Sequence, residues 1–315
     1  MFSRRYPRFL PLMALLAVVP CLAAEPTTQS VVPDSFMRFV DDSHGGGSLQ
    51  TADTAFRNPA GVVVHLIAAV HIGEKSYYDG LNRDFKGYDA VLYELVNSKN
   101  AAPPAPGNAE KSDNPISEFQ VFLKNFLDLD FQLDDIDYAA PNFVHADLDR
   151  ETFEKMQAQR GESFEQIMLR QLIKAFTDPP ATQPAADDDS DVDLITMLTR
   201  PDAERQLKVV IARQLGQMDL SAMGLDGPGG SVLVTERNKA ALKVLSDSMA
   251  AGKKNMAIFY GAAHMPDMTK RLEAMGFSPV STDWNVAWDL TIRPDQPSAM
   301  EKLMRNLVNS IKDQN

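Results

Sequence analysis

Two nearly continuous apolar runs, 62–70 and 90–95, dominate the hydrophobic pattern of the chain. Runs of this kind indicate strands that are buried on both faces, as in a parallel sheet. The segment between them, 74–85, has helical periodicity, so the three segments predict a β-α-β unit. The strand 255–260 and the helix 266–275 begin a second unit of the same kind.

The remaining segments place further elements around these two units. Polar alternation on both sides of a glycine turn predicts an antiparallel hairpin, 36–41 with 48–56, and further strands are expected at 277–282 and 285–292. Helical periodicity predicts helices near 116–128, 151–176, 202–218, 235–251 and 298–312. Together these elements predict an α/β fold: a mainly parallel central sheet built from two related βα halves and flanked by helices, with an N-terminal antiparallel hairpin and a helical insertion.

Residues 97–230 interrupt the strand pattern and are expected to form the helical insertion, with mobile loops. Pro and Ala dominate 101–107, while 177–193 contains three prolines followed by five aspartates, a composition that cannot bury a core. We expect residues 25–315 to form a single domain that carries this insertion.

The first 24 residues have the pattern of a signal peptide. A basic start with Arg4, Arg5 and Arg8 precedes the apolar run 10–22, which is too short to span a bilayer in the mature protein. We therefore expect secretion across the inner membrane to the periplasm, with no transmembrane segment in the mature chain. Two variants stay open: a lipoprotein anchored through Cys21 and a twin-arginine signal.

Removal of this leader changes both the charge and the cysteine content. The full chain has 31 Lys and Arg against 43 Asp and Glu, and loss of the three leader arginines takes the formal net charge from −12 to −15. Nucleic-acid binding is excluded as a function class because it requires a surplus of basic residues. The lone cysteine, Cys21, leaves with the leader, so disulfides and thiolate chemistry are excluded as well.

Two histidines stand at matching places in the two βα units. His71 and His264 each follow a buried strand and a short segment that begins with a small residue. Because ligands bind at the carboxyl ends of parallel strands, the two side chains can face one crevice. Among the other histidines, His44 in the glycine turn is expected to be solvated and His65 to be a hydrogen-bonded structural residue, while His145 fits either role.

Glu94 and Arg237 are the charged candidates for the same crevice. A carboxylate at the end of a buried strand needs a partner or a shifted pKa, and Glu94 can act as a general base or complete a two-His, one-carboxylate metal site. Arg237, in the first turn of a helix, can clamp a carboxylate or a developing oxyanion. The structural alternative is that the two residues pair and hold the fold. Tyr138 and Asp147 are interpreted as structural neighbours of the crevice.

Four motifs give the chain a resemblance to the TraB/PrgY/GumN family, which includes the Tiki extracellular metalloproteases. They are LIAAVHIG at 66–73, VLYEL at 91–95, TERN at 235–238 and IFYGAAHMP at 258–266. Family members carry two Gly-x-x-His motifs, with a glutamate after the first and an arginine before the second. This chain departs from that pattern at Ala68, which stands where the family has glycine.

The resemblance implies that His71, Glu94, Arg237 and His264 converge and that the reaction is metal-dependent peptide hydrolysis. Our leading hypothesis is a secreted metallohydrolase that acts on a peptide or small-molecule substrate. A divalent ion (Mn, Co or Zn) would be held by His71, Glu94 and His264, and Arg237 would stabilise the oxyanion. The alternatives are a non-catalytic protein that binds or sequesters a peptide or envelope component, and a metal-free acid/base hydrolase similar to the erythromycin esterases.

Overall fold

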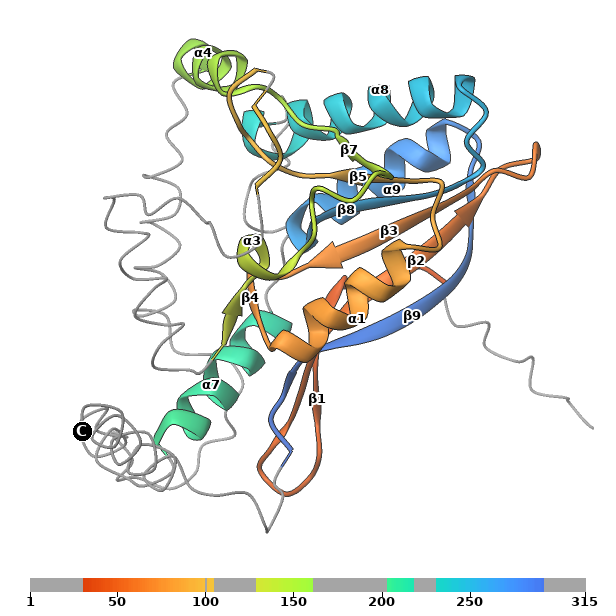
Figure 1. The fold of residues 1–315 in the computed structure, drawn as a ribbon. Coiled ribbons are helices and arrows are strands. Elements are labelled where there is room, and N and C mark those ends of the chain that lie inside the picture. The colour runs from red at the N-terminus through yellow and green to blue at the C-terminus, as the bar shows by residue number, and fades with distance from the viewer. Residues whose placement is uncertain (1–30, 100, 105–128, 161–202, 218–230, 292–315) are drawn as a thin grey trace, which may run out of the picture. The chain divides into compact units, whose positions relative to one another are not determined.

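A mixed seven-stranded sheet lies at the centre of the α/β fold (Figure 1). The computed structural model describes residues 31–99, 101–104, 129–160, 203–217 and 231–291, and all of them belong to one structural unit that begins at Val31. The sheet has antiparallel strands on its N-terminal side and parallel strands on the other side. The predicted fold class, with its hairpin and flanking helices, is confirmed.

Four parallel strands form the part of the sheet that carries the candidate residues. Their order is β3 (Val63–Ala69), β8 (Asn255–Gly261), β5 (Ala90–Tyr93) and β7 (Phe143–His145). The apolar runs seen in the sequence correspond to β3 and β5, and their side chains are almost all buried. The sequence suggested that these two strands are neighbours, but β8 lies between them and pairs with both.

The antiparallel side of the sheet consists of β1 (Met37–Asp41), β2 (Gly47–Arg57) and β9 (Ser278–Asp289). The first half of β2 pairs with β1, its second half pairs with β3, and its other edge pairs with β9. The φ angle of Gly47 is +149°, and an added Cβ would collide with the Val40 carbonyl oxygen, so the hairpin requires glycine here.

The strand expected at 277–282 and 285–292 is present as β9, which also includes residues 283 and 284 and therefore forms one continuous strand. The long strand β2 offers β9 a continuous partner, and two register shifts absorb the irregularity in the sequence.

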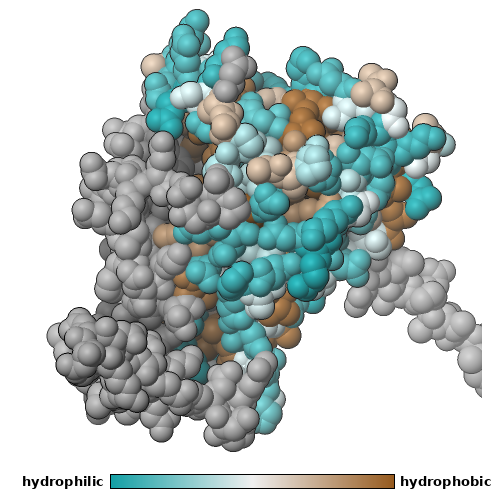
Figure 2. Space-filling view, viewed as in Figure 1, coloured by the Kyte–Doolittle hydropathy of each residue, from teal (hydrophilic) through white to brown (hydrophobic). Residues whose placement is uncertain are grey.

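Helices cover the two faces of the parallel strands. The helix α1 (Lys75–Phe85) buries Tyr77, Tyr78, Leu81 and Phe85 against the sheet, and Figure 2 shows its outer side as a band of hydrophilic side chains. The helices α8 (Arg237–Ala250) and α9 (Met265–Ala274) lie on the opposite face (Figure 1). Because α1 follows β3 and α9 follows β8, the two βα units place a helix start at the same end of the sheet.

The other helix predictions fall into two groups. Helix α7 (Ala203–Gln217) matches the expected helix near 202–218, and α4 (Arg150–Arg160) matches the beginning of the one near 151–176. The expected helices near 116–128 and 298–312, the acidic stretch 177–193 and the leader 1–24 lie outside the described residues. Within the described ranges, the helices are too short or too polar to cross a bilayer.

Candidate functional site

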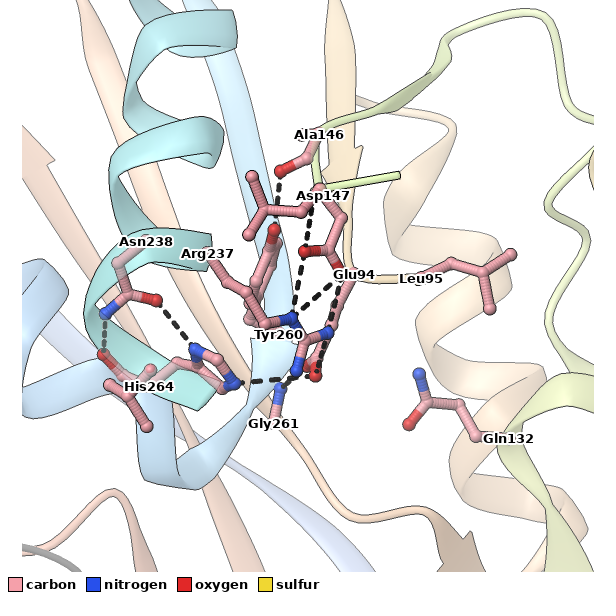
Figure 3. A network of polar contacts seen from close by, with 12 residues as sticks. Glu94, Leu95, Gln132, Ala146, Asp147, Arg237, Asn238, Tyr260, Gly261 and His264 are labelled. Atoms are coloured by element: carbon pink, nitrogen blue, oxygen red, sulfur yellow. Dashed lines mark hydrogen bonds and ion pairs between the residues drawn. The ribbon is translucent and has the colours of Figure 1, made fainter. Parts of the chain in front are cut away.

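The carboxyl ends of the four parallel strands bring the candidate residues together. Glu94 comes directly after β5, and Asp147 follows β7 by two positions. His264 ends the short 3-10 turn η2 (Ala262–His264), which continues β8. His71 stands between β3 and the two-residue strand β4 (Ile72–Gly73), so its strand does not lead directly into the helix as expected. Figure 3 shows the resulting network of polar contacts.

Glu94 is the centre of this network. Its Oε1 lies 2.7 Å from Arg237 Nη2, and its Oε2 accepts a hydrogen bond of 2.7 Å from the Gly261 N–H. Only 11% of the Glu94 side chain is exposed. Burial by itself would raise the pKa of this carboxyl, but the charge of Arg237, followed by that of His264, holds the pKa well below its usual range. Glu94 is therefore ionised at neutral pH.

Arg237 is held by a second carboxylate that the sequence had assigned only a structural role. Its Nε donates to Asp147 Oδ1 at 2.9 Å, and its Nη2 lies 2.5 Å from Asp147 Oδ2 (Figure 3). The Asp147 side chain is 0% exposed. Burial lowers the pKa of Arg237, but Glu94 and Asp147 outweigh burial and raise the pKa above its ordinary value. The two carboxylates thus keep the guanidinium charged and fix its orientation.

Arg237 stands where a π-helical turn passes into an α-helix. Arg237 is the first residue of α8, and the π-helical turn η1 (Val232–Glu236) directly precedes it. Such π turns are frequent at functional sites. Because η1 is capped by Ser231 and runs directly into α8, Arg237 lies beyond the first turn of the helical segment, where the macrodipole acts weakly, and Glu94 and Asp147 pair with its charge.

The orientation of the His264 ring is set by Asn238, a residue to which the sequence analysis assigned no role. The Asn238 Nδ2 donates to the His264 carbonyl oxygen at 3.1 Å and to Asp267 Oδ2 at 2.8 Å, so its Oδ1 is the acceptor that faces His264. The His264 Nδ1 lies 2.6 Å from this oxygen and therefore carries a proton. This hydrogen bond directs the other ring nitrogen, Nε2, toward Glu94 Oε1 at 3.4 Å.

His71 faces the same point from the other βα unit. A Cβ placed on Gly261 would lie 3.4 Å from Glu94 Oε2, 3.9 Å from His264 Cδ2 and 4.0 Å from His71 Nε2. His71 is exposed, whereas His264 is only 5% exposed. The three side chains therefore surround the space in front of Gly261, and the His71 ring is the one with room to move.

The two histidine motifs are offset by one residue in the sheet. Gly261 is in register with Ala69, and Ala68 is in register with Tyr260. His264 is three residues after Gly261, whereas His71 is two residues after Ala69, and the turn η2 contains the additional residue. Ala68 lies within β3 and its φ angle is not positive, so the backbone does not require glycine there.

The donor set around Gly261 is chemically suited to a divalent metal ion. Two imidazoles and one carboxylate are common ligands of such ions, and ligands about 2.0–2.2 Å from a tetrahedral centre lie roughly 3.3–3.6 Å from one another. The 3.4 Å separation of His264 Nε2 and Glu94 Oε1 matches that spacing. As they stand, however, the described side chains contain no group of three that encloses a metal position. The His71 ring would have to move toward Glu94 and His264 to complete the set of three ligands.

The other histidines and Tyr138 have separate roles. His44 is exposed, and His65 Nδ1 bonds Asp53 Oδ1 at 2.8 Å, as the sequence suggested for each. His145 is exposed and its Nε2 lies 2.6 Å from the Leu95 carbonyl oxygen. Tyr138 is buried beside the crevice, where its hydroxyl accepts a hydrogen bond from Gln132.

Two of the hollows in the described part of the chain can be compared with the site. One of about 320 Å³ opens beside Asp147 and is lined by Tyr93, Leu95, Lys99 and His145, among others. Another of about 540 Å³ lies at Glu74 and Asp289 and includes none of the candidate residues. We assign the chemistry to the carboxyl-end crevice because that is where ionised and oriented side chains converge.

The chain matched no protein-family model, no curated protein and no solved structure. The resemblance to the TraB/PrgY/GumN family therefore rests on the four sequence motifs, and the function is argued from the geometry of the crevice.

Proposed function

We propose that this chain is a secreted, periplasmic hydrolase that cleaves a peptide or amide bond with the help of a divalent metal ion. The observation that carries the proposal is the convergence of His71, Glu94 and His264 on the space in front of Gly261. Arg237 lies beside them with its charge fixed by Asp147. Membership of the TraB/PrgY/GumN family is part of the same proposal.

Glu94 and His264 would hold the metal, and His71 would complete the set. A divalent ion bound there supplies a water of lowered pKa and polarises the carbonyl of the substrate. Because His264 Nδ1 donates to Asn238 Oδ1, a metal would bind the other ring nitrogen, Nε2, which faces Glu94. Glu94 is already ionised, so no proton has to leave this carboxyl before it can bind a cation.

Arg237 would stabilise the negative charge that develops on the carbonyl oxygen. Its contacts with Asp147 and Glu94 use Nε and Nη2, which leaves Nη1 to donate to the substrate. Because Asp147 binds Nε and Nη2, the orientation of the guanidinium is set before the substrate arrives. Preorganised donors of this kind contribute strongly to catalysis.

Metal content and activity of single variants test this proposal. The chain is purified without added metal and analysed for bound metals, and a peptide library is then digested with Mn, Co or Zn present. We expect His264→Ala to lose both the bound metal and the activity, while His44→Ala, which alters an exposed histidine in the hairpin, keeps both. Equal metal content and activity in the wild type and His264→Ala would overturn the metal mechanism.

Metal-free acid/base hydrolysis is the second candidate, and one observation favours it. Glu94 Oε1 is already paired with Arg237 Nη2 at 2.7 Å, so a metal would have to share this oxygen with a guanidinium. In this mechanism a histidine of the crevice takes the proton of the attacking water. Activity that survives a strong chelator would select this mechanism. Stoichiometric peptide binding without any cleavage would instead indicate the non-catalytic binding protein.

A further inference from the structure

A buried glutamine faces the crevice with an unused hydrogen-bond acceptor. Gln132 is the first residue of α3 (Gln132–Asp135), directly after the short strand β6 (Asp130–Phe131). Its backbone N–H donates to the His71 carbonyl oxygen at 3.0 Å, and β6 pairs with β4. The position of Gln132 is therefore tied to the chain segment that carries His71.

The side chain of Gln132 is only half satisfied. Its Nε2 donates to the Tyr138 hydroxyl at 2.8 Å, but its Oε1 has no hydrogen-bond partner although the residue is only 5% exposed. Buried carbonyl oxygens are almost always paired, so an unpaired one requires an explanation. The amide of Asn238, which lies on the His264 side of the site, by contrast uses both its oxygen and its nitrogen.

The Gln132 amide is directed toward the reacting groups. Figure 3 shows the Gln132 side chain opposite Gly261 and the pair of Glu94 and Arg237. Tyr138, which binds Gln132 Nε2, is close enough to Glu94 for the carboxylate charge to act on its hydroxyl. The Tyr138 ring in turn packs on Tyr93, the last residue of β5, with centroids 5.0 Å apart. Gln132 and Tyr138 therefore form a buried pair beside the end of β5, where Glu94 follows.

We propose that Gln132 is a specificity-determining residue whose Oε1 accepts a backbone N–H of a bound peptide. This inference deepens the proposed function, because it names a peptide N–H as the feature that the crevice recognises. The donated hydrogen bond from Gln132 Nε2 to Tyr138 fixes which end of the amide faces the ligand. An oxygen that can only accept selects an N–H and rejects an ester oxygen at the same place.

Paired peptide and ester ligands test this inference through binding rather than cleavage. A pooled library of blocked pentapeptides is incubated with the whole chain, together with counterparts in which one backbone N–H is replaced by an ester oxygen. Retained ligands are identified by mass spectrometry. We expect the wild type to retain peptides about tenfold better than their ester counterparts at one backbone position, the effect of one buried hydrogen bond. Gln132→Met, which keeps the length of the side chain but removes its acceptor, should bring this ratio close to one.

Two further variants keep the test decisive. Gln50→Met makes the same chemical change in β2, where the amide oxygen accepts from Arg38, and should leave the ratio unchanged. Tyr138→Phe removes the hydroxyl that orients the Gln132 amide, so the ratio should fall although Gln132 is still present. If Gln132→Met does not fold, the peptide-to-ester ratio in Tyr138→Phe tests the inference in its place, and an unchanged ratio there would overturn it.

The outcomes for this inference and for the proposed function are distinguishable. A ratio near one in the wild type, an unchanged ratio in the crevice variants, or no retained peptide overturns the role of Gln132. Cleavage of peptides without discrimination against the esters would overturn that role but would still support the proposed hydrolase function. Discrimination that depends on Gln132, with no cleavage of any peptide, would support the role and contradict the hydrolase.

Discussion

The two histidine-bearing halves of the crevice have the same sequence pattern but different surroundings. On the β8 side, His264 is buried, bonded to Asn238 and packed edge-on against Tyr260 at 5.0 Å between ring centroids. On the β3 side, His71 is exposed, and its ring makes no hydrogen bond within the described ranges. One half is therefore preorganised by its neighbours, while the other can adjust when a ligand binds.

The charged centre belongs to the preorganised half. Glu94, Arg237 and Asp147 form a buried row of two carboxylates around one guanidinium, and His264 adjoins it. Burial of these groups is tolerable only because each charge is paired and hydrogen-bonded. Mutations on this side should therefore affect both the fold and the activity, whereas mutations on the His71 side should affect activity alone.

The largest effect is expected from Arg237→Met, which leaves Glu94 and Asp147 buried without their cation. Removing one partner of a buried ion pair costs about 3–5 kcal/mol, and two carboxylates lose their partner here. The free energy of unfolding, measured by denaturant titration, should fall by that amount. The matched control is Arg213→Met, which removes a largely exposed pair with Asp41 and should cost about 0–1 kcal/mol. Similar losses in both variants would contradict a buried charged centre.

The pH dependence of stability should change sign in the same variant. In the wild type the folded-state pKa of Glu94 is depressed, so its contribution to stability is present above the unfolded pKa of about 4.3 and is lost as the pH falls through the folded value. In Arg237→Met, burial without the cation raises the folded pKa of Glu94. Acidification from about pH 7 to pH 5 should then stabilise the variant but not the wild type. Parallel stability profiles would contradict this interpretation of Glu94.

His264→Ala and His71→Ala separate the two halves most directly. His264→Ala leaves the buried Asn238 oxygen unpaired and should lower the free energy of unfolding by about 1–3 kcal/mol. His71→Ala removes an exposed ring and should change it by less than about 0.5 kcal/mol. Both variants should lower kcat/KM by more than about 100-fold if both rings are ligands. Normal activity in His71→Ala would remove this residue from the site.

Asn238→Ala tests whether orientation of His264 matters for metal binding. Loss of an amide that orients a metal-bound histidine weakens metal affinity by about 10–100-fold, which calorimetry would measure. Asn142→Ala is the matched control, because Asn142 Nδ2 also donates to two acceptors, the carbonyl oxygens of Phe85 and Tyr88, but contacts none of the site residues through its side chain. An equal loss of affinity in both variants would point to general destabilisation.

Gly261→Ala is expected to keep or slightly increase the stability. The φ and ψ angles of Gly261, −53° and 143°, are accessible to alanine, and its Cβ would make ordinary contact with Glu94 Oε2 at 3.4 Å. The free energy of unfolding should stay the same or rise by about 0.4–1 kcal/mol. The added methyl group occupies the space between the two halves, so kcat/KM should fall. A fully active variant would show that ligands do not approach Gly261.

Much of the fold could be predicted because the signals are local. The buried strands, α1, α8 and α9 follow from apolar runs and helical periodicity, and the turn around Gly47 follows from its glycines. Glu94 attracted attention because a carboxylate at the end of an apolar strand is costly unless it is paired. The gap expected at 283–284 is absent because a local break in the hydrophobic pattern does not interrupt pairing with a long neighbouring strand.

The sequence by itself determined which side chains can do chemistry and placed His71, His264 and Glu94 at the ends of buried strands. Only the tertiary structure decided their partners. It inserted β8 between β3 and β5, and it supplied Asp147, Asn238 and Gln132, three ordinary polar residues with no local pattern of their own. The physical reason is that hydrophobic periodicity records how each segment is buried, whereas the orientation of a histidine or the charge state of a carboxylate depends on groups far away in the chain.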